Sequence, residues 1–254
     1  MKCAIKSNHP RTIERVETLR DELIDRQNKG EDSVEYDYIA FCTVMNAYCK
    51  HGDPEQAEAM LNELCAEALQ NRSSSKGKLQ IQGFLVVMRA WLRVDNPERA
   101  EAILQRICHY RDLKMPNIST MPDTYLSVVA CWNRSTDTRA GERTDNILKQ
   151  MEMDHDDLRI YEVGMIKDFY LQAMENLARV GDGERAEAML RRVHDRYSTN
   201  ENANSPLDFF LYREVINAWR QSQDQKSEEH IKRLEDEMES TFPNQPKGKT
   251  AARP

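Results

Sequence analysis

The segment Phe41–Leu64 reads FCTVMNAYCKHGDPEQAEAMLNEL, and its pattern returns four more times in this chain of 254 residues. Its first apolar residues have the spacing of one helix face: Phe41, Val44, Met45 and Tyr48. Then come Asp53, Pro54 and Glu55, which supply an N-cap acceptor, a proline suited to a first helical turn and an acid facing the helix dipole. A second amphipathic pattern begins at Ala57. The segment therefore predicts a hairpin of two helices, here named helix A and helix B.

Four further segments match helix A position by position; they begin at Phe84, Tyr125, Tyr170 and Tyr212. Each is followed by a helix B pattern, whose small leading residues are Ala100, Thr144, Ala186 and Ser227. Repetition at this length predicts a stacked array, in which each hairpin buries its apolar face against its neighbours. We therefore expect an all-α fold, namely a right-handed α-solenoid of stacked antiparallel helix-turn-helix repeats.

The repeats predict the organisation of the whole chain. Five repeats are expected, at residues 38–72, 81–115, 122–153, 167–198 and 209–240, with polar connectors between them. Residues 1–30 carry a helix B pattern with no helix A before it, which predicts the second half of a truncated leading repeat and raises the expectation of a longer parent chain. Residues 243–254 read PNQPKGKTAARP, a composition typical of a disordered tail.

Charge and composition exclude several classes of function. The net charge of −7 provides no general attraction to nucleic acid, so any such binding has to come from a local basic stripe. No apolar run is long enough for a membrane span, and no membrane partner is expected. The six cysteines form no CxxC pair, and we expect free thiols.

The sequence offers little support for catalysis. A zinc deaminase site would need a CxxC pair, which is missing. His155-Asp156-Asp157 is the one local group that resembles a metal site, and it lies in a polar connector without a companion histidine. We therefore predict a protein that is not an enzyme, with no metal, no cofactor and no small-molecule substrate.

Three repeats carry a resemblance to a known family. The relevant segments read YCKHGDPEQAEAMLNEL (48–64), AWLRVDNPERAEAILQRI (90–107) and LARVGDGERAEAMLRRV (177–193). An aromatic residue early in helix A, a basic residue that closes it, and an E-x-A helix B resemble the pentatricopeptide repeat (PPR). Tetratricopeptide repeats share the hairpin but lack the early aromatic and the closing basic residue, so they are the second choice.

The resemblance implies binding of single-stranded RNA in a mitochondrion or plastid, with side chains of the inner groove reading the bases. In this family the residue after the helix A aromatic faces a base, and the corresponding positions are Cys42, Leu85, Leu126, Leu171 and Arg213. Because leucine has no hydrogen-bonding group, sequence-specific readout is not expected at three of these positions.

The family also places a basic residue near the end of helix A, facing RNA phosphate. The matching residues are Lys50, Arg93, Arg134 and Arg179, and the fifth copy has Gln221. Arg89 and Arg213 are expected on the same face. A cation in the last helical turn is also favoured by the helix dipole alone, so this alternative stays open.

The aromatic residues that close helix A have two interpretations. Tyr48, Trp91, Trp132 and Trp219 could stack on bases, but their neighbours on the helix face are apolar, which favours core packing. The alternative function for the whole chain is a scaffold that binds a protein partner in its groove. The net negative charge and the leucines at base-facing positions favour that alternative.

Overall fold

The computed structural model of the chain describes residues 34–70, 79–115, 117–154, 163–197 and 206–243, together with positions 14, 15, 17, 18, 21, 22 and 25. Every element named in these ranges is an α-helix. The chain divides into two compact units, Met1–Thr124 (unit 1) and Tyr125–Pro254 (unit 2). The predicted leading half repeat at 1–30 and tail at 243–254 lie almost wholly outside the described residues.

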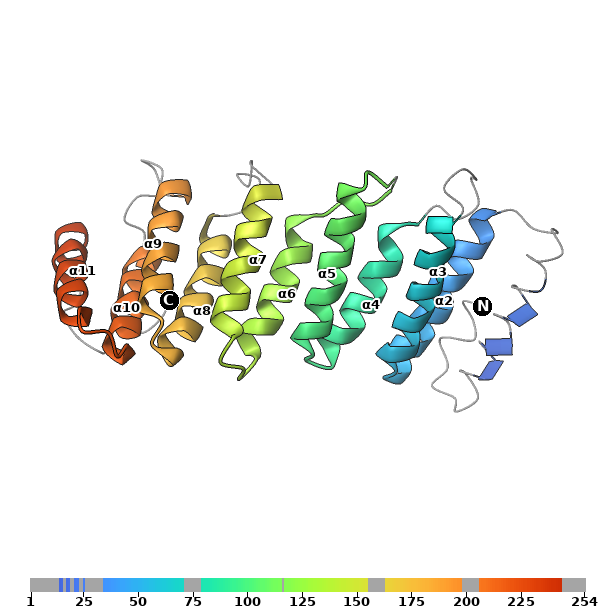
Figure 1. Cartoon of the computed structure of the whole chain (residues 1–254), viewed down its shortest axis with the longest axis horizontal. Helices are drawn as coiled ribbons and strands as arrows, with labels where there is room; N and C mark the ends of the chain where they lie inside the picture. Colours follow the sequence, from blue (N-terminus) through green and yellow to red (C-terminus); the bar gives the residue numbers. More distant parts are fainter. Residues whose placement is uncertain are drawn as a thin grey trace. The chain divides into compact units, whose positions relative to one another are not determined.

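Unit 1 contains two antiparallel helical hairpins (Figure 1). Its helices are α2 (Val34–His51), α3 (Pro54–Gln70), α4 (Ile81–Arg93) and α5 (Pro97–Asp112). Within the hairpins, α2 packs against α3 and α4 packs against α5. Between the hairpins, α4 packs against both α2 and α3, so the second hairpin covers the first.

Unit 2 continues with the same hairpin design (Figure 1). Its helices are α6 (Pro122–Arg134), which begins three residues before the unit boundary, α7 (Ala140–Asp154), α8 (Val163–Val180), α9 (Gly183–Tyr197), α10 (Pro206–Gln221) and α11 (Ser227–Thr241). The packing again runs between consecutive hairpins, because α8 contacts α7, α9 and α10, and α10 contacts α9 and α11. The predicted all-α fold of stacked helical hairpins is confirmed, whereas the predicted limits of single repeats stay predictions.

The apolar residues at the repeated positions of the sequence form the core of each unit. In helix A of every copy the predicted face is buried, apart from the half-exposed Phe41. The closing aromatics Tyr48, Trp91, Trp132 and Trp219 are at most 4% exposed, which confirms that they pack in the core. The small leading residue of helix B is also buried in every copy, because two helices of a hairpin approach closely there.

The turn between helices A and B has one backbone geometry in three copies. The residue eleven positions after the helix A aromatic has a positive φ: Gly52 at 82°, Asp95 at 50° and Gly181 at 73°. The next amide N–H then donates to the carbonyl five residues back, at 3.0 Å for Asp53 to Tyr48 and Asn96 to Trp91, and 3.1 Å for Asp182 to Leu177. This is the Schellman arrangement, which ends helix A and explains glycine at two of the three positions.

The same turn starts helix B. The side chain of Asp53 accepts from the amide of Gln56 at 3.0 Å, and Asn96 and Asp182 do the same for the amides of Arg99 and Arg185 at 3.1 Å. A cap of this kind is worth about 1 kcal/mol, and it satisfies an amide that has no partner within the helix. Because one helix ends and the other begins within a few residues, the hairpin geometry is set locally.

A carboxylate of one repeat binds the closing aromatic of the next, an arrangement here named the carboxylate clamp. In unit 1, the indole Nε1 of Trp91 and the guanidinium of Arg99 each donate to Oε2 of Glu58, both at 2.8 Å. Glu58 is only 7% exposed, and Arg99 also lies over the Trp91 ring. The hydroxyl of Tyr48 donates in the same way to Glu17, at 2.7 Å. A buried indole N–H needs such an acceptor, so the clamp favours one register between hairpins.

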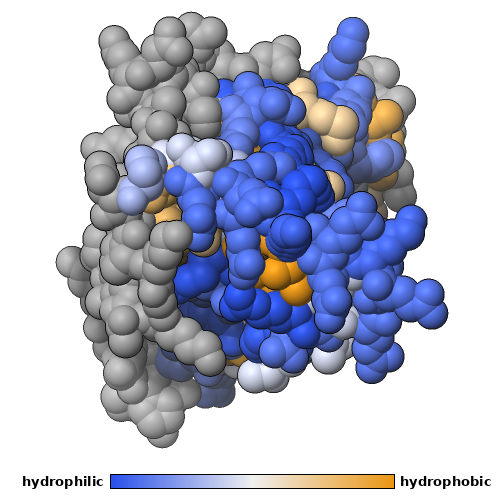
Figure 2. Space-filling model, turned by 90° about the vertical axis from the view of Figure 1, so that its left-hand side faces the viewer, coloured by the Kyte–Doolittle hydropathy of each residue, from blue (hydrophilic) through white to orange (hydrophobic). Residues whose placement is uncertain are grey.

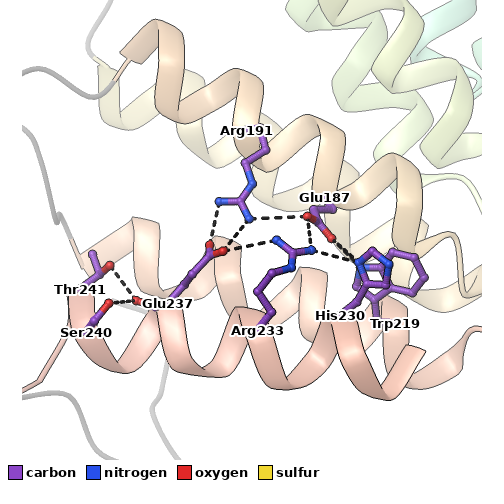
Figure 3. A network of polar contacts seen from close by, with 8 residues as sticks. All are labelled: Glu187, Arg191, Trp219, His230, Arg233, Glu237, Ser240 and Thr241. Atoms are coloured by element: carbon purple, nitrogen blue, oxygen red, sulfur yellow. Dashed lines mark hydrogen bonds and ion pairs between the residues drawn. The ribbon is translucent and has the colours of Figure 1, made fainter. Parts of the chain in front are cut away.

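Unit 2 has its clamp at Glu187 of α9 (Figure 3). The Trp219 indole donates to it at 3.1 Å, and Arg233 of α11 donates at 2.6 Å. His230 stacks on Trp219 with ring centroids 4.1 Å apart, and its Nδ1 is 3.2 Å from the same carboxylate. Burial alone would raise the pKa of Glu187, but hydrogen bonds from Arg233, His230 and Trp219 hold it below its usual value.

Glu237 of α11 extends this network (Figure 3). Arg191 of α9 binds both of its carboxylate oxygens, at 2.7 and 3.0 Å, and Arg233 reaches it at 3.3 Å. The hydrogen bonds from Arg191 hold the pKa of Glu237 below its usual value. The contacts from α9 and α10 to α11 therefore join three helices of unit 2 through charged groups.

The outward surface of α11 is hydrophilic. Its exposed residues are Glu228, Glu229, Lys232, Arg233, Asp236, Glu239 and Ser240. Figure 2 shows this side of the molecule, where polar residues surround a small apolar area. Leu234, on the opposite face, is fully buried, so α11 has the amphipathic pattern of a helix that packs on one side only.

We expect Glu58→Ala to lower the free energy of unfolding by about 2–3 kcal/mol, because it leaves the Trp91 N–H buried without an acceptor. Chemical denaturation of the full chain measures this loss. Glu63→Ala, on the exposed side of the same helix, is the matched control and should change stability by less than about 0.5 kcal/mol. Equal losses in the two variants would contradict a role for the clamp.

We expect Glu237→Gln to destabilise the chain at pH 7 by about 0.5–1 kcal/mol, since the pair is partly exposed to solvent. A carboxyl whose pKa is lowered by folding stabilises the protein above its unfolded pKa of about 4.3. The difference from wild type should therefore disappear as the pH falls through the lower, folded value. Denaturation curves from pH 7 to pH 3 test this, with exposed Asp236→Asn as the control. A difference that persists at the lowest pH would refute the assignment.

Candidate functional site

The four basic residues predicted to close helix A are all on the surface. Lys50 and Arg93 lie in the last turns of α2 and α4 in unit 1, and Arg134 and Arg179 lie in the last turns of α6 and α8 in unit 2. All four side chains are exposed. At the fifth position, Gln221 ends α10 and is also exposed. The two units nevertheless differ in what these cations contact.

In unit 1 the cations form an open face, here named the basic face: Lys50, Arg89 and Arg93. Helices α2 and α4 are in contact, with Cys49 Sγ 3.7 Å from the carbonyl oxygen of Val86. All three cations are exposed, and none makes a hydrogen bond or ion pair with another described residue. Arg89 lies before the last turn of α4, so compensation of the helix dipole does not account for it.

The thiol of Cys49 lies beside the basic face, where the charges of Arg93 and Asp53 both act on it. Cys49 beside it is buried, and burial raises the pKa of its thiol to about 11, although the charge of Arg93 partly opposes that rise. The thiol is therefore uncharged at neutral pH and does not compete for the cations. Such a surface attracts an anion from solution without first breaking an internal ion pair.

In unit 2 the matching cations are bound to the protein itself. Arg179 donates to the side chain of Asn176 and, at 3.3 Å, to the backbone carbonyl of Ser135. Arg134 donates to the carbonyl of Ala130 in its own helix at 3.0 Å. Arg213, predicted to add charge to this face, forms an ion pair with Glu214 at 3.2 Å, and its role in RNA binding stays a prediction.

A network of polar side chains joins α6, α7 and α8 around Asn133. Its oxygen accepts from Asn176 at 2.9 Å and from Thr144 at 3.3 Å, and its amide nitrogen reaches Gln172 at 3.5 Å. Asn176 and Thr144 are buried. Arg179 extends this network, which explains why its head group is held beside α6.

The five predicted base-facing positions do not form a uniform row. Cys42 and Leu85 in unit 1 and Arg213 in unit 2 are half-exposed. Leu126 and Leu171 are only 4% and 1% exposed, so the structure places these two side chains in the core and not against a ligand. At these two positions the side chain after the helix A aromatic packs in the core.

Two exposed polar residues beside the basic face were missed from the sequence. Asn46 of α2 and Gln82 of α4 are both exposed. Asn46 occupies the same position in helix A as Arg89, five residues after the aromatic. This shared position could have indicated Asn46 from the sequence, but the sequence prediction included only basic residues.

Other kinds of site were also sought within the described ranges. No group of three or more His, Cys, Asp or Glu side chains there is arranged to hold a metal ion. The cluster His155-Asp156-Asp157 lies outside the described residues. Among the helices in those ranges, none combines the length and apolar character needed to cross a membrane.

We expect Arg179→Ala to lower the free energy of unfolding by about 1–2 kcal/mol, because it removes the hydrogen bond from α8 to the Ser135 carbonyl and a donor to buried Asn176. Arg89→Ala is the matched control, and it should change stability by less than about 0.5 kcal/mol, since this side chain has no internal partner. Thermal and chemical denaturation measure both. A larger loss in the Arg89 variant would show that the basic face is structural.

Comparison with protein families finds one match. Residues 39–67 match the model of the PPR repeat, a segment that includes the exposed Lys50 and the turn at Gly52. Neither the curated proteins nor the solved structures contain a match to the chain. The other hairpins repeat the turn, cap and core positions of the matched one, with degenerate sequences. Residues 39–67 are thus similar to a PPR repeat, and the other described hairpins are built on the same pattern.

Proposed function

We propose that this protein is a non-enzymatic adaptor that binds single-stranded RNA in a mitochondrion or plastid and acts in RNA processing, stability or translation. The observation that carries the proposal is the basic face, three exposed cations on adjacent A helices that have no partner among the residues the structure describes. Part of this face, Lys50, belongs to the recognised PPR repeat. Members of the family typically bind RNA or proteins through such helices.

The charges favour contact with phosphate over reading of bases. The net charge of −7 opposes general attraction to a polyanion, so affinity has to come from a local cluster. Leucine at position 85, beside the basic face, offers no hydrogen bond to a base edge. We therefore expect binding that tolerates many sequences and depends strongly on salt.

The second candidate function is a protein-interaction scaffold. The negative net charge favours it, as does the burial of Leu126 and Leu171 where base readers would lie. A protein partner would contact the half-exposed polar side chains of the A helices, and its binding would need no phosphate. The two proposals differ in their response to RNA.

The test is equilibrium binding of a fluorescent, randomised 20-nucleotide single-stranded RNA to the full chain at 50 and 200 mM salt. We expect affinity to fall as salt rises, and Lys50→Glu/Arg93→Glu to weaken binding by about tenfold or more through lost phosphate contacts. The control is Lys114→Glu/Lys232→Glu, which changes the net charge equally at exposed sites off the A helices. No binding at 50 mM salt would refute the proposal and favour the scaffold.

A further inference from the structure

We infer that unit 1 alone holds the RNA phosphates, and that the matching cations of unit 2 are structural. This inference rests on the proposed function and narrows it to one part of the chain. It follows from the different surroundings of cations that occupy the same position in helix A. A cation already bound inside the protein has to lose those contacts before it can bind a phosphate.

The parts of α2 and α4 that carry the basic face contain no acidic residue, and the acids of α2, Glu35 and Asp37, lie at its opposite end. Residues 41–51 of α2 read FCTVMNAYCKH and residues 81–93 of α4 read IQGFLVVMRAWLR, and neither stretch contains aspartate or glutamate. Asp53, in the following turn, accepts the amide of Gln56 as an N-cap. The charges of Lys50, Arg89 and Arg93 are therefore directed to solvent, one from α2 and two from successive turns of α4.

The A helices of unit 2 contain acids of their own. Asp168 and Glu175 lie on α8 and Glu214 lies on α10. Glu214 is 8% exposed and binds both Arg213 and Asn217, the latter at 3.2 Å. A strand of phosphates along these helices would meet carboxylates as well as compensated cations. The electrostatic gain expected from each contact is correspondingly smaller.

The contacts of Arg179 show the same division of roles. Its guanidinium bridges α8 to the carbonyl of Ser135, which follows α6, and it also binds the side chain of Asn176 within the Asn133 network. Moving this group onto a phosphate would remove a donor from the side-chain oxygen of buried Asn176 and break the bond to Ser135. The same residue type that is available in α4 thus stabilises a helix contact in α8.

The number of available cations limits the salt dependence of binding. Single-stranded RNA releases about 0.7 counterions for each phosphate that is neutralised. Three cations on the basic face thus predict a slope of log K against log salt of about −2. Participation of the cations of unit 2 would give a steeper slope, of about −4.

The test compares two variants of the full chain with the same loss of charge. The unit 1 variant is Lys50→Gln/Arg89→Gln/Arg93→Gln, and the unit 2 variant is Arg134→Gln/Arg179→Gln/Arg213→Gln. A labelled 12-nucleotide oligouridylate is titrated at several salt concentrations, and thermal unfolding is recorded for each protein. Arg89→Lys/Arg93→Lys retains the charges and serves as the conservative control for unit 1.

We expect the unit 1 variant to lose affinity about tenfold or more, and its salt slope to approach zero, while its thermal stability is unchanged. The conservative control should bind like wild type. The unit 2 variant should unfold at a lower temperature and keep wild-type affinity and slope. An equal loss of affinity in the unit 2 variant would overturn the inference and leave the proposed function standing.

Photo-crosslinking keeps the test decisive if the unit 2 variant fails to fold. Wild-type protein is crosslinked to the same oligonucleotide containing 4-thiouridine, and the modified peptides are mapped. Crosslinks confined to residues 41–93 support the inference, and crosslinks within residues 163–221 overturn it. Absence of RNA binding by the wild-type chain at low salt would instead refute the proposed function itself, and this inference with it.

Discussion

The stacking of these hairpins depends on a carboxylate that is buried at the contact between one repeat and the next. Glu58 and Glu187 each accept the indole N–H of the tryptophan that closes the following helix A. Removing a carboxylate from water is costly, and it is compensated only if several donors converge on it, so that the neighbouring hairpin has little freedom to slide. Where the closing residue is Leu177, which has no donor, Asp145 holds that place in α7 and is bound by Lys149 and Arg192, both at 2.7 Å. The carboxylate is thus satisfied by a donor from the next hairpin, Arg192 of α9, together with Lys149 of its own helix.

This constraint separates two uses of charge in the same fold. Charges between B helices are paired and partly buried, and they stabilise the stack, as in the network of Glu187, Arg191, Arg233 and Glu237. Charges at the ends of the A helices are exposed and can serve a ligand only where no internal partner holds them. That condition is met by the basic face of unit 1. The same sequence position can therefore be functional in one hairpin and structural in another.

Degeneracy of the repeats has a similar physical origin. Leu126 and Leu171 occupy positions where the family presents polar base readers, and both are buried. Apolar residues there add to the core and offer no hydrogen-bonding group to a ligand. The nearby side chains of Asn176 and Gln172 in α8 instead form hydrogen bonds with Asn133 in α6.

The sequence by itself determined the helices, the hairpins and the core, because these depend on local rules. Apolar spacing defined the buried faces, and Gly52 and Gly181 marked turns whose positive φ is imposed within a few residues. The position of the basic residue near the end of helix A could be predicted from the sequence for the same reason. Only the tertiary structure showed that Arg179 is held by Ser135, because this partner is 44 residues away in the sequence. The carboxylate clamp was likewise not predicted, because a glutamate on a helix looks solvent-exposed until the tryptophan of the next repeat covers it. Spacing along the chain determines one hairpin, whereas the roles of its charged side chains depend on the neighbour that packs against it.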